Sequence, residues 1–166
     1  MNISQRSNSH HSLQANFQPH ESMQDAYKTQ SDLPEPSVCP QCSAIYQQGH
    51  WHWGKTPAGA HAATCPACRR KKDHSPAGFL TLRGGFLWEH RGEVMDLVNQ
   101  VEKRERAEHP LKCIMSIEEM ENAILVTTTD IALAKAIAES IQSVYKGSLR
   151  QHFNADQKLL RIEWMH

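Results

Sequence analysis

The sequence predicts an α+β protein in which a four-cysteine ribbon precedes a small domain of helix, strand, strand, helix, strand and strand, with a mainly antiparallel sheet. Three observations support this class. Two C-x-x-C pairs lie between residues 39 and 68, apolar residues with helical spacing begin at residue 94, and alternating or β-branched stretches follow residue 110. We expect three segments: an arm at 1–38, the ribbon at 39–84 and the α+β domain at 85–166.

The first segment has the composition of an unfolded chain. Residues 1–38 are rich in Ser, Asn, Gln and His and contain no run of branched apolar residues. Burial cannot offset the entropy cost of ordering such a segment, so we expect a disordered arm. The arm lacks the basic start and apolar stretch of a signal peptide, and the sequence has no run of 18 apolar residues. We therefore expect a cytoplasmic protein with no membrane partner.

The cysteine pairs predict a metal site. Cys39-Pro-Gln-Cys42 and Cys65-Pro-Ala-Cys68 are separated by 22 residues. Each C-x-x-C turn points two sulfurs at one ion, and two such turns complete a tetrahedral thiolate site. Zn2+ is the expected metal, and iron in a rubredoxin-like pair of turns is the alternative. Because all four ligands come from the protein, we expect a structural site in a zinc ribbon rather than a catalytic one.

Tryptophans and histidines alternate between the two cysteine pairs, in Gly49-His50-Trp51-His52-Trp53-Gly54. In a strand this pattern puts Trp51 and Trp53 on one face and the two histidines on the other. The tryptophan face either packs over the metal site or offers stacking surfaces to RNA bases.

A run of cations, Arg69, Arg70, Lys71 and Lys72, follows the last cysteine directly. The chain has no formal net charge, yet residues 39–91 carry seven cations and two anions, a balance of +5. Four thiolates with one divalent ion carry a net negative charge, which nearby cations would neutralise. The run exceeds that need, so we also consider that these residues, together with Arg83, contact RNA phosphates.

The elements that follow are read from spacing. Residues 79–83 alternate and are expected to close the ribbon as its last strand. A helix is expected from about Gly92, because apolar residues recur at helical spacing up to Val101, and Pro110 should end it. A half-buried strand is then expected from Leu111 to Ile117, and a second strand over residues 123–129.

The last part of the chain predicts one helix and one hairpin. Asp130 can cap a helix that stops at Lys146-Gly147, and residues 149–154 and 158–165 read as two paired strands. The resulting four-stranded sheet should carry its helices on one face. Arg150, His152 and Arg161 should lie on the opposite face.

The sequence contains no recognisable catalytic pattern. It has no nucleophile elbow, no phosphate-cradling glycine loop and no paired-carboxylate motif. Glu118, Glu119 and Glu121 are expected to lie in a solvated turn. We therefore expect a protein that is not an enzyme and has no small-molecule substrate.

Several of these residues together resemble a known family. They are Cys39-Pro-Gln-Cys42, Tyr46, Trp51, Cys65-Pro-Ala-Cys68-Arg69-Arg70, Pro76-Ala77-Gly78, Leu82-Arg83-Gly84 and His109-Pro110-Leu111. The combination, from about Val38 to Trp164, resembles a small bacterial family of zinc-ribbon proteins without an assigned activity. That family in turn distantly resembles the amino-terminal zinc region of the archaeal and eukaryotic nuclear-export adaptor of the large ribosomal subunit.

The resemblance implies association with the ribosome or ribosomal RNA, under stress. The leading hypothesis is thus a zinc-ribbon protein that binds RNA on the ribosome. The alternative is a protein-protein interaction module, or adaptor, in which zinc only staples a docking surface. An iron-bearing electron carrier is the third class considered.

Overall fold

The computed structural model describes Tyr27 and residues 32–166. Most of the expected arm, residues 1–26 and 28–31, lies outside the described residues. The described fold begins before Cys39, because the first strand, β1 (Ser37–Val38), falls within the segment assigned to the arm. Ser37 is fully buried and Leu33 packs against the cysteines, so these residues belong to the ribbon.

The ribbon contains a small sheet of very short strands. Besides β1 it holds β2 (Ile45–Gln47), β3 (His50–His52) and β4 (His61–Ala62), in the order β3-β2-β1-β4. β1 pairs antiparallel with β2 and parallel with β4. A seven-residue helix, α1 (Pro66–Lys72), follows and carries the whole basic run.

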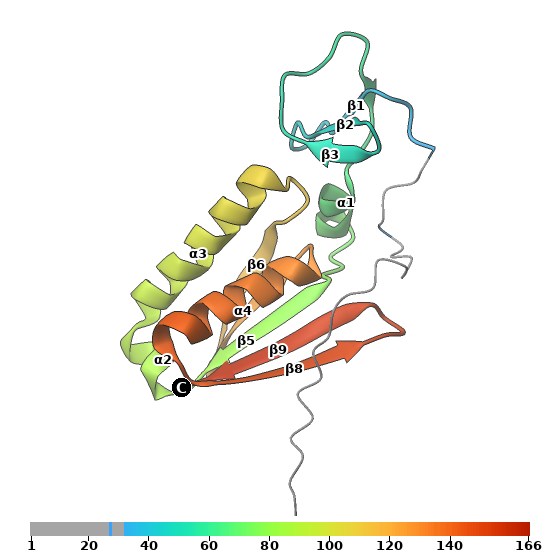
Figure 1. Ribbon diagram of the computed structural model, residues 1–166. Coiled ribbons are helices and arrows are strands. Elements are labelled where there is room, and N and C mark those ends of the chain that lie inside the picture. Colours follow the sequence, from blue (N-terminus) through green and yellow to red (C-terminus); the bar gives the residue numbers. More distant parts are fainter. Residues whose placement is uncertain (1–26, 28–31) are drawn as a thin grey trace, which may run out of the picture.

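The larger sheet has five strands in the order β6-β7-β5-β9-β8. Its members are β5 (Gly78–Arg83), β6 (Ile114–Met120), β7 (Ala123–Thr128), β8 (Ser148–Asn154) and β9 (Leu159–Met165). Central strand β5 pairs antiparallel with β7 and parallel with β9. Figure 1 shows β5 running through the middle of this sheet, below the ribbon.

Two expectations about the sheets were wrong for one reason. The strand at residues 79–83 does not close the ribbon, and the sheets are mixed rather than mainly antiparallel. Alternation predicts that these residues form a strand, but it cannot identify the partner strands. Leu80 and Leu82 are fully buried in the main core, which fixes β5 between β7 and β9. The parallel pairing follows from that position.

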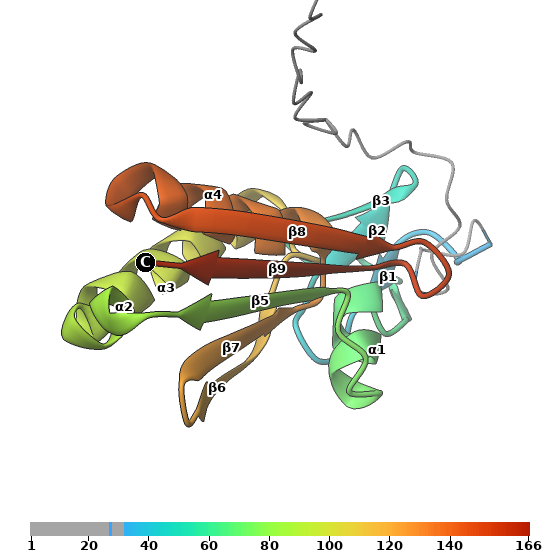
Figure 2. The same ribbon diagram turned by 90° about the horizontal axis from the view of Figure 1, so that it is seen from below.

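Three helices cover one face of the larger sheet: α2 (Gly85–Glu89), α3 (Arg91–Glu108) and α4 (Ile131–Tyr145). Figures 1 and 2 show α3 and α4 side by side on this face. Their apolar stripes, including Val94, Val98, Ile137 and Ile141, meet the inward side chains of the strands in one core. Trp164 is the largest fully buried side chain among the described residues.

Several local expectations are confirmed. The helix expected to begin near Gly92 is α3, preceded by the short α2, and it ends just before Pro110. The Asp130 carboxylate accepts a hydrogen bond from the Leu133 N–H at 3.0 Å and so caps α4. The final hairpin forms as β8 and β9.

The strand expected from Leu111 to Ile117 is displaced toward the C-terminus. It runs from Ile114 to Met120, with a register shift between Ile114 and Ser116. Glu118 and Glu119, which we expected in a turn, therefore lie in β6. The shift leaves the segment just after Pro110 free to pack against the ribbon, as described below.

The second face of the larger sheet is not covered by α2, α3 or α4. Arg150 and His152 of β8 pair with Glu163 and Arg161 of β9, two residues that alternate with the buried Ile162 and Trp164. The expected placement of Arg150, His152 and Arg161 opposite the helices is confirmed. We call this surface the open face.

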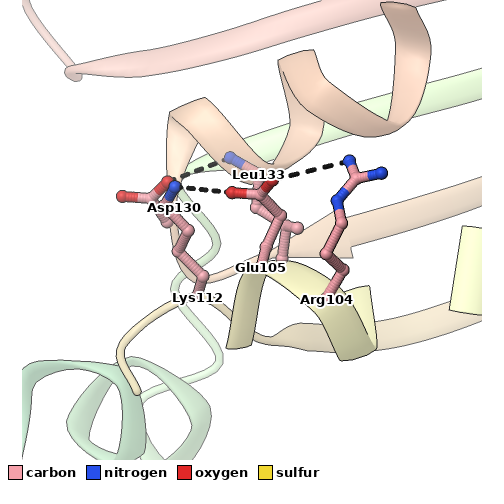
Figure 3. Close-up of polar contacts among 5 residues, drawn as sticks. All are labelled: Arg104, Glu105, Lys112, Asp130 and Leu133. Carbon is pink, nitrogen blue, oxygen red and sulfur yellow. Dashed lines mark hydrogen bonds and ion pairs between the residues drawn. The ribbon is translucent and has the colours of Figure 1, made fainter. Parts of the chain in front are cut away.

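Polar contacts near the start of β6 join the loop after α3 to that helix. Lys112 Nζ lies 2.8 Å from Glu105 Oε2, and Arg104 Nη2 lies 3.6 Å from Glu105 Oε1. Figure 3 shows the Glu105 carboxylate between the two cations, near the Asp130 cap of α4. Within Tyr27 and residues 32–166, every helix is too short or too polar to span a membrane.

Candidate metal centre

The four predicted cysteines meet at one point. The Sγ atoms of Cys39, Cys42, Cys65 and Cys68 all lie within 4.8 Å of one another. A tetrahedron with metal–sulfur bonds of about 2.3 Å has edges of about 3.8 Å. The Sγ atoms of Cys42 and Cys65 are 3.7 Å apart, which matches that edge. The four sulfurs are therefore positioned to hold a metal ion.

The first pair lies in a tight turn between β1 and β2. The Cys39 N–H donates to the Ala44 carbonyl and the Ser43 N–H donates to the Cys39 carbonyl, both at 2.8 Å. Ser43 adopts a positive φ of 65°, which reverses the chain after Cys42. These backbone contacts bring both sulfurs to the same side of the turn.

The second pair opens helix α1. Cys65 is the N-cap residue, and Pro66 stands in the first helical turn, where its missing N–H costs no hydrogen bond. The Cys68 N–H donates to Cys65 Sγ, and the Cys65 N–H donates to Cys39 Sγ, both at 3.4 Å. Such N–H groups stabilise thiolate charge, as expected of metal ligands.

The electrostatics of the site favour a cation. Burial, and then the negative charge of the neighbouring sulfurs, raises the pKa of Cys65 strongly and that of Cys68 to about 12. Cys39 is also desolvated by burial, but hydrogen bonds from the backbone of Cys65, Cys42 and Gln41 bring its pKa down to about 7. Four thiolates at this spacing need a positive ion among them.

A small apolar cluster surrounds the sulfurs and reaches beyond the ribbon. Tyr46 and Trp51 are buried in it with Cys39 and Cys65, and the ring centroids of the two aromatics lie 5.4 Å apart. Cys113, from the loop before β6, belongs to the same cluster. It is not one of the four sulfurs, and burial raises the pKa of its thiol. The site thus fixes the ribbon against the α+β domain.

The tryptophans play different parts. Trp51 is only 6% exposed and packs with the cysteines, which matches the expectation that this face covers the metal site. Trp53 lies just after β3 and is exposed, but its Nε1–H donates to the Arg106 carbonyl at 2.6 Å. This bond joins the ribbon to α3. Trp51 therefore offers no stacking surface, and the exposed ring of Trp53 is held against the α+β domain.

The four cations of the basic run lie on different sides of helix α1. Arg70 lies on the buried side of α1 with Ala67, is 5% exposed, and donates from Nη1 to the Ser75 carbonyl at 3.0 Å. Lys71 and Lys72 are exposed and Arg69 is half-buried. Cations in the last turn also interact favourably with the helix dipole. Three of the four predicted cations thus stay at the surface, and Arg70 instead holds the loop that follows.

Arg83 does not join this group. It ends β5, whereas α1 precedes the start of that strand, and its Nε lies 2.9 Å from Glu163 Oε1. Sequence reasoning also missed the helix itself. Pro66 directly after Cys65 is a helix-start signal, and a helix over residues 66–72 would have placed Arg70 on the same side as Ala67.

Comparisons of the chain with protein-family models, with curated proteins and with solved structures found no match.

Proposed function

We propose that this chain is a non-enzymatic, cytoplasmic zinc-ribbon protein that binds RNA, on the ribosome and under stress. The observation that carries the proposal is the position of three cations on one short helix that starts at the metal site: Lys71 and Lys72 are exposed and Arg69 is half-buried. A zinc ion on the four cysteines would fix the start of α1 and so hold the three cations as a preformed phosphate-binding surface.

Neutralising the cluster does not require all of these cations. Burial raises the pKa of Cys113, and the positive charges of Lys71 and Arg106 oppose that rise, so the α+β domain also contributes positive charge near the sulfurs. Lys72 is exposed at the end of α1. The sequence resembles a zinc-ribbon family without an assigned activity, and the distant resemblance of that family to the export adaptor of the large ribosomal subunit implies an RNA partner.

A triple variant, Arg69→Ala, Lys71→Ala and Lys72→Ala, tests the proposal. Arg70 is kept because its loss would remove the bond to Ser75 and disturb the fold. Three phosphate contacts on single-stranded RNA give a salt slope of about −2.1, or about a 20-fold loss of affinity between 50 and 200 mM salt. The salt slope of RNA binding should therefore be shallower by about 2.1 in the triple variant than in the natural chain.

The measurement is binding of fluorescein-labelled single-stranded RNA, together with sedimentation of cell lysate through a sucrose gradient. A matched control variant, Lys103→Ala, Arg104→Ala and Lys135→Ala, removes equal charge from α3 and α4. We expect the control to bind RNA and migrate with ribosomal subunits like the natural chain. Equal RNA binding by the natural chain and the α1 variant would refute the proposal.

A groove between α3 and α4 favours the second candidate, an interaction module. Leu97, Val101, Ala136 and Val144 line a hollow of about 580 Å3, and Val144 is 57% exposed. This candidate predicts a stoichiometric protein partner whose capture survives nuclease and depends little on salt. Val144→Glu should abolish that capture, whereas it should leave RNA binding unchanged.

A further inference from the structure

A pocket lies between helix α1, which carries the basic run, and the open face of the larger sheet. It encloses about 490 Å3, within the range of about 300–1,000 Å3 that holds small ligands. Lys71 and His74 line it from α1 and the turn that follows, Pro76 lines it from the segment before β5, and β5, β6 and β7 supply the rest. Figure 2 shows α1 at the end of the sheet where β5 begins.

The floor of the pocket suits a flat aromatic ligand. Phe79, Met115 and Leu125 provide the apolar surface. Met115 lies at the register shift of β6, where a strand bends and turns a side chain out of its usual direction. Ser116 and Thr127 add two hydroxyl groups, whose Oγ and Oγ1 atoms lie 2.7 Å apart. Hydroxyls beside an apolar surface can bond to the edge of a base that stacks there.

The ring of Phe79 is held in place from the other side. Phe79 is paired with Arg161 of β9, and the Arg161 guanidinium lies 4.6 Å from the ring centroid. The pocket extends in the opposite direction, toward β7 and β6. Because the Phe79 ring is already held in place, its side chain loses little conformational entropy when a base stacks on the side that faces the pocket.

The pocket has basic residues at one end and a carboxylate at the other, which matches the phosphate and the base of a nucleotide. Phe79, Thr127 and Ser116 form one row across the sheet, and the next row on the same face pairs Leu125 with Glu118. The first row is nearer to α1, because β5 starts at Gly78. Lys71 and His74 therefore lie at one end of the pocket and Glu118 at the other, about 7 Å beyond the Phe79 row.

We propose that this pocket binds one unpaired nucleotide of the RNA, and this inference rests on the proposed function. The base stacks on Phe79, its phosphate contacts Lys71 and His74, and Glu118 accepts a hydrogen bond from an exocyclic amino group. Carboxylates of this kind bind the amino group of cytosine. Uracil lacks that group, so the pocket should prefer cytosine to uracil.

The test uses the full zinc-loaded chain and two fluorescein-labelled RNAs of ten nucleotides, oligo-C and oligo-U. Phe79→Leu keeps an apolar side chain but removes the stacking ring. We expect it to weaken oligo-C binding by about 5-fold to 150-fold, the range measured for one base–aromatic stack, without changing the salt slope. Glu118→Gln should reduce the preference for oligo-C over oligo-U.

Trp88→Leu is the matched control. Trp88 is also an exposed aromatic residue, but it lies in α2 at the opposite end of the sheet from α1 (Figure 1). Its replacement should leave binding unchanged. A titration of the natural chain followed by NMR needs no variant, and the amide signals of Ser116 and Thr127 should move when oligo-C is added.

The outcomes separate the two proposals. If the triple α1 variant loses RNA binding while Phe79→Leu binds normally and the Ser116 and Thr127 signals do not move, the pocket inference is wrong and the proposed function stands. If the natural chain binds neither RNA, both fail. Loss of oligo-C affinity in Phe79→Leu but not in Trp88→Leu, with shifts at Ser116 and Thr127, would establish the pocket.

Discussion

Removal of the metal should unfold the ribbon and leave the larger sheet intact. The two regions have separate cores, and apart from cysteine the ribbon buries three large side chains among the described residues, Ile45, Tyr46 and Trp51. At about 1.5–3 kcal/mol for each, their burial contributes about 4.5–9 kcal/mol. Zinc on four thiolates contributes about 10–16 kcal/mol in comparable small sites. A zinc ion on the four cysteines would therefore supply most of the stabilising free energy of the ribbon.

The indole N–H signals of the four tryptophans give a direct NMR assay. Trp51 and Trp53 report on the ribbon, Trp164 reports on the main core through its 2.7 Å bond to the Lys146 carbonyl, and Trp88 is exposed on α2. After EDTA treatment the Trp51 and Trp53 signals should move to the position of an unfolded chain. The Trp164 signal should stay.

Metal analysis of two cysteine variants completes the test. Cys65→Ser removes a ligand and should reduce bound zinc from one ion per chain, whereas Cys113→Ala should leave the stoichiometry unchanged because Cys113 is not among the four clustered sulfurs. A coloured protein with bound iron would contradict the assignment of zinc. Ribbon indole signals that remain dispersed after complete metal removal would refute the energetic reasoning.

Three further changes test the packing of the α+β domain by thermal unfolding. Gly78→Ala should destabilise the fold by about 1–3 kcal/mol, because its new Cβ would lie 2.6 Å from Ala134 Cβ. Gly92→Ala is the control and should not destabilise the fold, because its new Cβ would meet nothing within 4 Å. Asp130→Ala should cost about 1 kcal/mol through loss of the α4 cap, and an unchanged midpoint would contradict that role. The hydrogen bond from Lys112 lowers the pKa of Glu105 in the folded protein. The stability that this pair adds is therefore fully present above the unfolded carboxyl pKa of about 4.3. It is lost as the pH falls through the lower pKa of the folded protein. Lys112→Met should remove that acid-dependent loss, which unfolding midpoints between pH 3 and pH 7 would reveal.

Local sequence patterns predicted the elements that depend on near neighbours. Asp130 and the helix it caps, the final hairpin and the stop of α3 before Pro110 all rest on contacts within a few residues. Register and partner choice depend on distant parts of the chain. The position of β5 was therefore missed, because burial of Leu80 and Leu82 in a shared core selects it, and the start of β6 was missed because its pairing with β7 sets it.

The sequence by itself determined which four sulfurs meet at the candidate metal centre. A C-x-x-C turn brings two sulfurs together through its own backbone, so Cys39, Cys42, Cys65 and Cys68 could be assigned from spacing alone. Only the tertiary structure decided the roles of the cations and aromatics around them. Arg70 turns inward, Trp51 is buried and Phe79 meets Lys71 across a pocket, because surface exposure depends on how a helix and a sheet pack together.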